Sequence, residues 1–310
     1  MSVTFKNPDI SVGKVFCDFC SFTYAVKDQS EQSHIRKRLS ADALKEMGYL
    51  AYKTARRRYK HGVSVRVDMQ SEETVRLSCD PWIESSAFFR AEFNPSKINL
   101  IDVKILIERV LKSSWVTIIL TSKFTRIDAA VDIANVQIDS LLLSVPKIQV
   151  SRLFCKNGET QTYELGCLEG NIIIKFYDKR AEIIAKNHKK QLKDTVPGGA
   201  LTRCEVRLKP KALLEELGDI TNPFLKIRVQ DYALLPQLDD QLFRLTIRIA
   251  QCRGMQDALL LLDPPDRKKM VKKLESASCP WWNGQAIWSN WKHELVKLAI
   301  PPPPYKVLHG

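Results

Sequence analysis

The sequence lacks any apolar run close to the roughly 18 residues that a membrane-spanning helix requires. Its longest apolar stretches are short, such as residues 115–120 and 258–262. The first ten residues carry Lys6 and Asp9, with no apolar stretch behind a basic start, so they do not resemble a secretory signal. We therefore expect a cytoplasmic protein without a membrane anchor.

The chain also has few of the cysteine and histidine patterns that bind metals. Cys17 and Cys20 form a C-x-x-C pair, but no second C-x-x-C or H-x-x-x-H pair follows. A structural zinc site needs such a second pair. Both cysteines lie in the apolar stretch 15–26, which predicts a strand. Reduced core cysteines, with neither a zinc site nor a disulfide framework, are the favoured interpretation.

Positive charge is plentiful. The 310 residues include 48 Lys and Arg against 35 Asp and Glu, a formal net charge of +13. Residues 36–60 hold nine cations against two acids, and residues 175–209 hold ten against four. Clusters of this kind are typical of phosphate-binding surfaces, although they also occur on ordinary solvated faces.

The first cluster falls on an expected helix that begins at Ser40 and ends near Gly62. On this helix two tyrosines and three cations would share a face, at spacings suited to base stacking and phosphate binding. The residues of this face are Tyr49, Tyr52, Lys53, Arg56 and Lys60. We expect Lys53, Arg56 and Lys60 to contact DNA, while the tyrosines could equally be packing residues.

The remaining pattern predicts strands packed with segregated helices. Strands are expected at 63–69, 74–78, 149–154, 161–165, 171–177 and 201–209, and residues 115–133 are expected to form two strands or one bent strand. Helices are expected at 101–111 with Asn99 as cap, 180–193, 211–217, 253–262, 266–275 and 285–298. This predicts an α+β fold: a largely antiparallel sheet with flanking helices in a domain 1–215, then a mainly helical region 216–310 with a Pro- and Trp-rich end.

The first chemically suggestive segment is the strand around Arg126, Asp128 and Asp132. Residues two apart in a strand share a face, so these three side chains point together while Ile127 and Val131 point to the core. Paired carboxylates are hard-oxygen ligands for Mg²⁺ or Mn²⁺. They could equally be half of a surface ion-pair ladder.

The second segment places Arg203, Glu205 and Arg207 on one face of a strand, with Cys204 and Val206 behind them. A carboxylate among cations fits a metal ligand surrounded by phosphate-binding groups. A cross-strand ladder of ion pairs to Asp128 and Asp132 would give the same pattern.

The third segment places Lys175, Tyr177 and Lys179 on one face. A phenol has a pKa near 10, so a nucleophilic tyrosine needs nearby cations or a metal to favour the phenolate. Two lysines on its face would help, but a strand-edge tyrosine with solvated neighbours is the alternative.

Taken in order, these motifs resemble a known family. The order is Arg126-x-Asp128-x-x-x-Asp132, Tyr163-x-x-Gly166, Tyr177-Asp178-Lys179-x-x-Glu182 and Arg203-x-Glu205-x-Arg207. It is similar to the rolling-circle replication initiators of plasmids and filamentous phages, the Rep_trans type. The opening Asp18-Phe19-Cys20-Ser21-Phe22-Thr23 also looks like the start of phage members, so the resemblance spans roughly residues 15–215.

The resemblance implies a metal-dependent endonuclease and strand transferase. In such proteins a tyrosine attacks one phosphodiester of the origin, leaves a 3′-hydroxyl primer and a 5′-phosphotyrosyl link, and the strand is later rejoined. Carried onto this chain, the nucleophile would be Tyr177, with Tyr163 as the alternative. The remaining roles would be metal ligation by Asp128, Asp132 and Glu205, phosphate binding by Lys179, Arg203 and Arg207, and further DNA contact by Arg126 and Lys175.

The five histidines, at 34, 61, 188, 293 and 309, form no His-x-His pair. Other nicking enzymes use that pair to hold the metal, so a nickase of this sequence needs an acidic site for Mg²⁺ or Mn²⁺.

Two rival functions remain open: a non-catalytic phage or plasmid DNA-binding regulator, and a recombinase or transposase that uses the same tyrosine chemistry. The expected partner is origin DNA, single-stranded or supercoiled, in a bacterial host. A host helicase that docks on Trp281, Trp282, Trp288 and Trp291, and a second copy of the chain, are further possible partners; core packing is the favoured role of these tryptophans.

Overall fold

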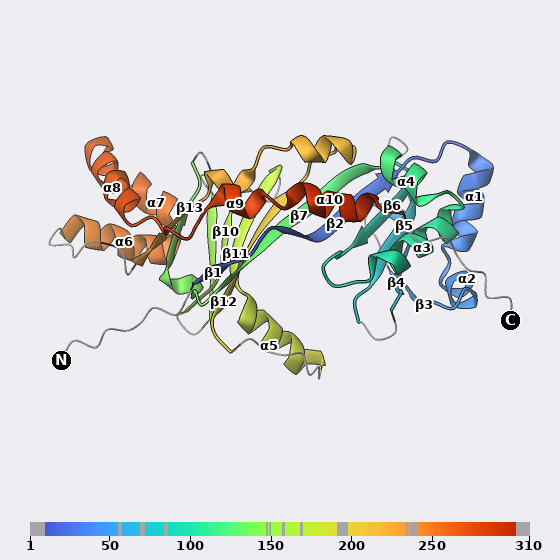
Figure 1. Cartoon of the computed structure of the whole chain (residues 1–310), viewed down its shortest axis with the longest axis horizontal. Helices are drawn as coiled ribbons and strands as arrows, with labels where there is room; N and C mark the ends of the chain where they lie inside the picture. The colour runs from blue at the N-terminus through green and yellow to red at the C-terminus, as the bar shows by residue number, and fades with distance from the viewer. Residues whose placement is uncertain are drawn as a thin grey trace. The chain divides into compact units, whose positions relative to one another are not determined.

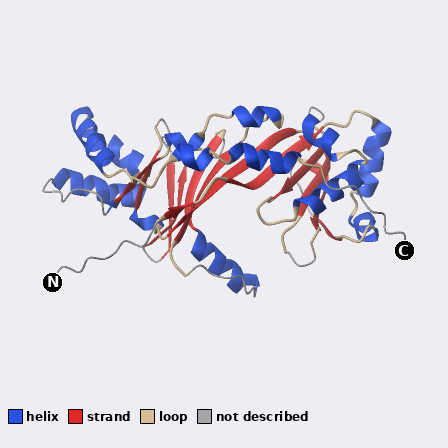
Figure 2. Ribbon diagram, viewed as in Figure 1, coloured by secondary structure: helices blue, strands red, loops and turns tan. Residues whose placement is uncertain are grey.

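The computed structural model describes residues 10–54, 58–68, 72–83, 86–146, 148, 150–156, 159–167, 170–190, 198–232, 235 and 241–301. It confirms the expected α+β class: a large antiparallel sheet, flanking helices and a helical C-terminal region (Figures 1 and 2). Among the described helices, none is both long and apolar enough to cross a membrane.

The chain divides into two compact units, each assembled from separated segments. Unit 1 comprises Met1–Val15, Ala130–Arg207 and Thr221–Asn290. Unit 2 comprises Phe16–Ala129, Leu208–Ile220 and Trp291–Gly310. The domain boundary expected after residue 215 falls inside the segment Leu208–Ile220 of unit 2.

Unit 2 is a sheet with the strand order β3-β4-β5-β6-β2-β7, in which the last strand, β7, also enters unit 1. Its strands are β2 (Phe16–Tyr24), β3 (Leu50–Lys53), β4 (Tyr59–Arg66), β5 (Val75–Pro81), β6 (Phe89–Phe93) and the start of β7 (Lys123–Ala134). Its helices are α1 (Gln29–Arg38), α2 (Ala41–Glu46), α3 (Leu100–Leu111), α4 (Trp115–Thr121), the 3₁₀ helix η2 (Glu215–Asp219) and α10 (Trp291–Ala299).

Alternation of side chains gives the unit 2 sheet one apolar face. Phe22 in β2 and Phe93 in β6 are buried there, and their ring centroids lie 6.4 Å apart. Trp115 of α4 packs edge-on against Phe22 at 6.0 Å. Asn99 caps α3 as expected, with its side chain accepting a hydrogen bond from the backbone N–H of Ile101. Cys17 and Cys20 are buried in β2, which confirms their core role.

The expected helix over residues 40–62 is wrong. Ser40 does cap a helix, but α2 ends at Glu46, and β3 and β4 follow. Gly48 adopts φ 89°, and its N–H bonds the carbonyl of Lys45, which closes the helix in a left-handed turn. Beyond it, Ala51 of β3 and Tyr59 of β4 are buried in the sheet, so burial by strand pairing outweighs helix spacing.

The expectation of strands throughout residues 115–133 is wrong in its first half. Residues Trp115–Thr121 form α4, and only Lys123–Ala134 form a strand. Ser114 caps α4 by accepting a hydrogen bond from Thr117 N–H. Trp115, Ile118 and Ile119 are buried at helical spacing, so a helix buries all three while an alternating strand would expose one of the two isoleucines.

Unit 1 contains a sheet with the strand order β9-β10-β11-β12-β7, and β1 pairs with the end of β7. Its strands are β1 (Ser11–Val12), β8 (Leu141–Ser144), β9 (Ser151–Lys156), β10 (Glu159–Leu165), β11 (Ile172–Asp178), β12 (Leu201–Leu208, of which Leu208 falls in unit 2) and β13 (Arg228–Asp231), with β8 and β13 forming a second, two-stranded sheet. Its helices are η1 (Ile138–Ser140), α5 (Lys179–Lys190), η3 (Pro223–Lys226), α6 (Gln241–Arg253), α7 (Met255–Leu260), α8 (Pro264–Ser276) and α9 (Gly284–Trp288).

The helical C-terminal region was expected, but its helices differ in detail. Helix α6 was missed, the helix expected at 211–217 is the 3₁₀ turn η2, and the helix expected at 285–298 is broken between α9 and α10. Helices α6, α7 and α8 form a core with Leu142 of β8. The Trp282 indole packs on Phe176 and donates to the carbonyl of Ile227, and buried Trp291 donates to that of Leu217. These two tryptophans are core residues.

Candidate functional site

Tyr177 lies near the end of β11, half-buried. Its strand neighbours alternate: Phe176 is buried on one face, while Lys175 and Tyr177 share the other. Directly opposite Tyr177 in β10 is Thr162, and opposite Lys175 is Glu164. The phenol therefore stands on the polar face of the unit 1 sheet, next to a lysine, as the alternation predicted.

Lys179, the first residue of α5, is 5% exposed. Its ammonium lies 5.7 Å from the centre of the Tyr177 ring and forms an ion pair with Glu182 one turn along the helix. Asp178 caps the same turn by accepting a hydrogen bond from the N–H of Ala181 at 2.8 Å. The turn thus holds a buried cation beside the tyrosine.

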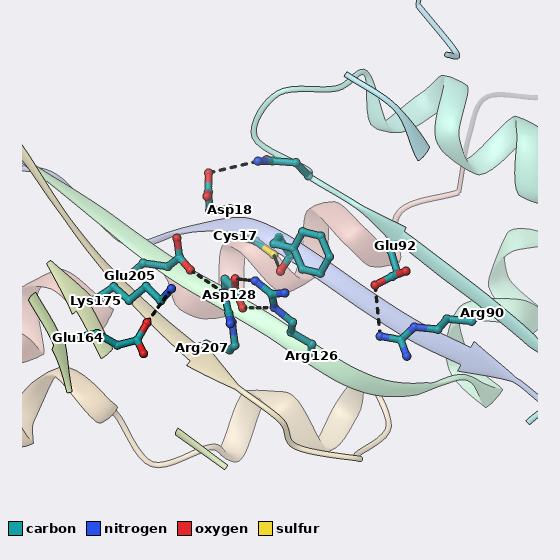
Figure 3. Close-up of polar contacts among 12 residues, drawn as sticks. Cys17, Asp18, Arg90, Glu92, Arg126, Asp128, Glu164, Lys175, Glu205 and Arg207 are labelled. Carbon is teal, nitrogen blue, oxygen red and sulfur yellow. Dashed lines mark hydrogen bonds and ion pairs between the residues drawn. The ribbon is translucent and has the colours of Figure 1, made fainter. Parts of the chain in front are cut away.

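Glu164 is the centre of an ion-pair group that the sequence did not single out. It is 4% exposed and accepts a hydrogen bond from Lys175 at 2.8 Å (Figure 3). It also accepts one from Arg152 of β9 at 3.0 Å. Burial alone would raise the pKa of Glu164, but the two cations outweigh it and hold the pKa below its usual value. In the sequence, Glu164 could have been found as the charged residue between Tyr163 and Leu165 in the strand expected at 161–165.

Tyr163, the alternative nucleophile, lies on the opposite face of the sheet. It is directly opposite Phe176 in the neighbouring strand and is 3% exposed. Its hydroxyl donates to the carbonyl of Ala250 in α6, and burial raises the pKa of the phenol far above its usual value. A buried phenol that favours its proton and faces a helix is placed to stabilise the packing of α6.

The strands β7 and β12 carry ion pairs, one between the two strands and the others within a single strand. Arg203, itself 7% exposed, donates two hydrogen bonds to Asp132, at 2.6 and 2.8 Å, in a bidentate pair. Arg207 donates to Glu205 of the same strand at 3.5 Å (Figure 3). In unit 2, Arg126 forms a bidentate pair with Asp128, which is 1% exposed, and its guanidinium stacks 4.2 Å above the ring of Phe19.

These pairs bear directly on the expected metal site. Asp128, Asp132 and Glu205 each have an arginine partner. Among the described residues no group of three or more His, Cys, Asp or Glu is placed to hold a metal ion. As they stand, the three carboxylates fit the ion-pair ladder and not a ready-made site for Mg²⁺ or Mn²⁺.

A cavity of about 380 Å³ opens in unit 1 where β11 meets α5. Its polar lining includes Gln137, Gln161, Asp178, Arg180 and Thr202. The sequence did not indicate it, because its walls come from four separate segments. Its volume lies within the range of small-ligand pockets.

Two cations of the expected DNA-binding helix, Lys53 and Lys60, lie on strands of unit 2. Lys53 is exposed at the end of β3. Lys60 in β4 pairs with Asp80 at 3.3 Å and stacks over the exposed ring of Trp82. Arg56 lies outside the described residues. Asp80 also pairs with Arg36, so it neutralises part of the cluster's charge.

Comparisons with known proteins find a likeness among solved structures. No protein-family model and no curated protein matches the chain. Among solved structures, the chain is similar to the rolling circle replication initiator protein from Geobacillus stearothermophilus, with a TM-score of 0.39 and 15% identity over 86% of this chain and 97% of that chain. At this TM-score the likeness carries no residue roles from one chain to the other.

Proposed function

We propose that the protein is a rolling-circle replication initiator that nicks one strand of its origin through Tyr177. The observation that carries the proposal is the position of Tyr177. It is half-buried on a polar sheet face with Lys175, beside the buried ammonium of Lys179. Cations close to a phenol favour its ionised, nucleophilic form.

In the proposed reaction, the phenolic oxygen of Tyr177 attacks a phosphorus of the DNA backbone. The bond from phosphorus to the 3′ oxygen breaks, the phenol proton goes to solvent, and the 3′ oxygen takes up a proton. The phosphate remains on the tyrosine as a 5′-phosphotyrosyl ester, and attack by a 3′-hydroxyl reverses the step. Cations of α5 and of β12, the strand next to β11, are the groups proposed to bind the phosphate: Lys179, Arg203 and Arg207.

A divalent ion, Mg²⁺ or Mn²⁺, on Asp128, Asp132 and Glu205 is part of the proposal that rests on the family resemblance alone. To bind an ion, these carboxylates would have to exchange their arginine partners for it. When bound, such an ion would polarise the scissile phosphate. The experiment that tests the proposal therefore compares the reaction in Mn²⁺ with the reaction in chelator.

The cavity beside Asp178 is the proposed position of a nucleotide that flanks the nick. It begins at the residue after Tyr177, and its glutamine side chains at 137 and 161 offer both donors and acceptors to a base edge. Changes at these glutamines should alter which oligonucleotide is cut and leave the chemistry at Tyr177 in place.

The test is incubation of the purified protein with labelled oligonucleotides that tile its own replicon, in Mn²⁺ or in chelator. A covalent protein–DNA band on a denaturing gel that Tyr177→Phe abolishes and Tyr163→Phe retains supports the nickase. A band that survives Tyr177→Phe assigns the nucleophile elsewhere. A band that persists in chelator removes the metal from the proposal.

A second candidate, a DNA-binding regulator without catalysis, is favoured by the ion pairs. Asp132 and Arg203 satisfy each other through two hydrogen bonds, which is the expected state of a purely structural pair. Salt-sensitive binding with no covalent band on any tiled or supercoiled substrate would support this candidate.

A further inference from the structure

Units 1 and 2 have the same strand order. If the five main strands of each unit are numbered along the chain, unit 2 runs β2, β3, β4, β5, β6 and unit 1 runs β7, β9, β10, β11, β12. In both sheets the strands lie side by side in the order second, third, fourth, fifth, first. This order is β3-β4-β5-β6-β2 in unit 2 and β9-β10-β11-β12-β7 in unit 1. Both sheets place the first strand beside the fifth, and we infer from this shared order that unit 2 repeats the strand arrangement of unit 1.

A sequence motif recurs at matching places in the two sheets. The fifth strand of unit 1 contains Arg203-Cys204-Glu205, and that of unit 2 contains Arg90-Ala91-Glu92. In both strands the arginine and glutamate share the polar face, with a buried small residue between them. Arg90 pairs with Glu92 at 3.3 Å (Figure 3). It also donates a hydrogen bond to Ser21 in the first strand at 3.1 Å.

The chemistry differs between the two repeats. The residue that Arg203 binds in the first strand is Asp132, whereas the residue opposite Arg90 is Thr23. The fourth strand of unit 1 carries Tyr177, but the fourth strand of unit 2, β5, contains no tyrosine. Unit 2 therefore keeps the cation of the polar face and lacks the nucleophile.

The polar face of unit 2 has an open strip over β3, β4 and β5. Tyr52, Ser64 and Arg76 lie directly opposite one another on these three strands, and Arg66 follows Ser64 on the same face. We call these four residues the basic strip. The ring of Tyr52 is 54% exposed and Arg76 is exposed, while Ser21 and Ser78 farther along the face are buried.

Glu92 of β6 lies directly opposite Arg76, and its carboxylate pairs with Arg90 at 3.3 Å. Among the described residues, neither Arg66 nor Arg76 forms an ion pair or a side-chain hydrogen bond. They are diagonal neighbours on adjacent strands, a relation that places side chains within about 8 Å. At this spacing both guanidinium groups can bind one anionic ligand that carries several charges.

We propose that the basic strip is a binding surface for single-stranded DNA in a repeat of the fold that does not nick. Arg66 and Arg76 bind backbone phosphates, the exposed ring of Tyr52 stacks on a base, and the short side chain of Ser64 lets the strand approach the sheet. The identity of the ligand as DNA rests on the proposed function. The exposure of the strip and the lack of a tyrosine in β5 are features of the structure and do not depend on the proposed function.

Binding of the full-length protein to a fluorescent oligothymidine measures the strip independently of the origin sequence. The double variant R66Q/R76Q should bind more weakly and lower the slope of log affinity against log salt by about 1.4, since each single-strand phosphate contact contributes about 0.7. Tyr52→Ala should weaken binding about five- to a hundredfold. The matched control is K45Q, which removes an exposed cation from α2.

The pair R66K/R76K keeps the charge and should restore most of the affinity, which separates phosphate binding from a folding defect. Photocrosslinking of an oligonucleotide with 5-iododeoxyuridine should label peptides of β3, β4 or β5. An unchanged affinity and salt slope in R66Q/R76Q, a loss that equals that of K45Q, or crosslinks confined to unit 1 peptides would each overturn the proposal.

The same preparations distinguish this proposal from the nicking reaction. If no covalent band forms with any origin oligonucleotide but the strip variants still lose oligothymidine binding, the strip stands and the nickase fails. If the band forms and the strip variants bind oligothymidine as tightly as wild type, the strip fails and the nickase stands. Loss of duplex binding alone, with single-strand binding intact, also refutes the strip as proposed.

Discussion

Glu164 should contribute measurably to the stability of unit 1, and only above its unfolded pKa. Its carboxylate is 4% exposed and bonds Lys175 at 2.8 Å and Arg152 at 3.0 Å. Removing one partner of a fully buried ion pair costs about 3–5 kcal/mol. Here Lys175 and Arg152 are 28% and 39% exposed and can turn to water, so we expect about 2 kcal/mol for Glu164→Gln.

The pH dependence follows from the direction of the pKa shift. The pKa of Glu164 is lower in the folded chain than its usual value, so the unfolded chain binds this proton more readily. The stabilisation is therefore complete above the unfolded pKa of about 4.3 and is lost as the pH falls from there through the folded pKa. Wild type and Glu164→Gln should differ most at neutral pH and converge in acid.

Urea denaturation at pH 7, 5, 4 and 3.5, followed by circular dichroism, measures this difference. A loss of about 2 kcal/mol corresponds to about 4–8 °C in melting temperature for a unit of this size. The matched control is Glu275→Gln, which neutralises an exposed glutamate of α8 in the same unit. Equal stability of Glu164→Gln and wild type at pH 7, or a difference that stays constant down to pH 3.5, would refute the reasoning.

Three further predictions concern single side chains. Arg203→Ala should cost about 2 kcal/mol in urea denaturation, because the two hydrogen bonds to Asp132 are lost while that carboxylate, 35% exposed, can turn to water. Arg203→Lys should cost less, and equal losses would contradict the bidentate pair. Tyr163→Phe should cost about 1 kcal/mol by losing its bond to Ala250 and should leave any covalent DNA band intact, which a gel decides. Burial lowers the pKa of Lys104 to about 8, so the unfolded chain binds this proton more tightly than the folded chain does. The free energy of unfolding should therefore rise between about pH 8 and 10 in wild type and stay level in Lys104→Met. A rise that persists in Lys104→Met would assign the pH dependence to another group.

Local patterns in the sequence determine much of the site. The alternation of Lys175, Phe176 and Tyr177 assigns each side chain to a face of its strand, because strand geometry repeats every two residues regardless of the rest of the fold. The same rule placed Arg203, Glu205 and Arg207 together. Caps act within one helical turn, which is why Asn99 and Ser40 were correct starting points for helices.

Where those helices end was harder to predict. Residues 41–60 contain apolar residues at helical spacing, but Gly48 ends the helix in a left-handed turn and the next segment joins a sheet. The energy that decides this comes from burying Ala51 of β3 and Tyr59 of β4 in the sheet, and no local window contains their partners on other strands. The same limitation applies to α4, whose Trp115 packs on Phe22 more than ninety positions earlier in the chain.

Only the tertiary structure determines which charged side chains pair, and which of Tyr163 and Tyr177 is buried against a helix. The sequence left Asp132 equally suited to a metal and to an ion pair, and the contact with Arg203 came only with the pairing of β7 and β12. Tyr163 and Tyr177 are separated by the register of β10 and β11, in which Tyr177 faces Thr162 and Tyr163 faces Phe176. Register depends on hydrogen bonds between distant segments, and a slip of one residue would exchange the two faces. The sequence by itself thus specifies the face of each strand, and the packed sheet specifies what that face meets.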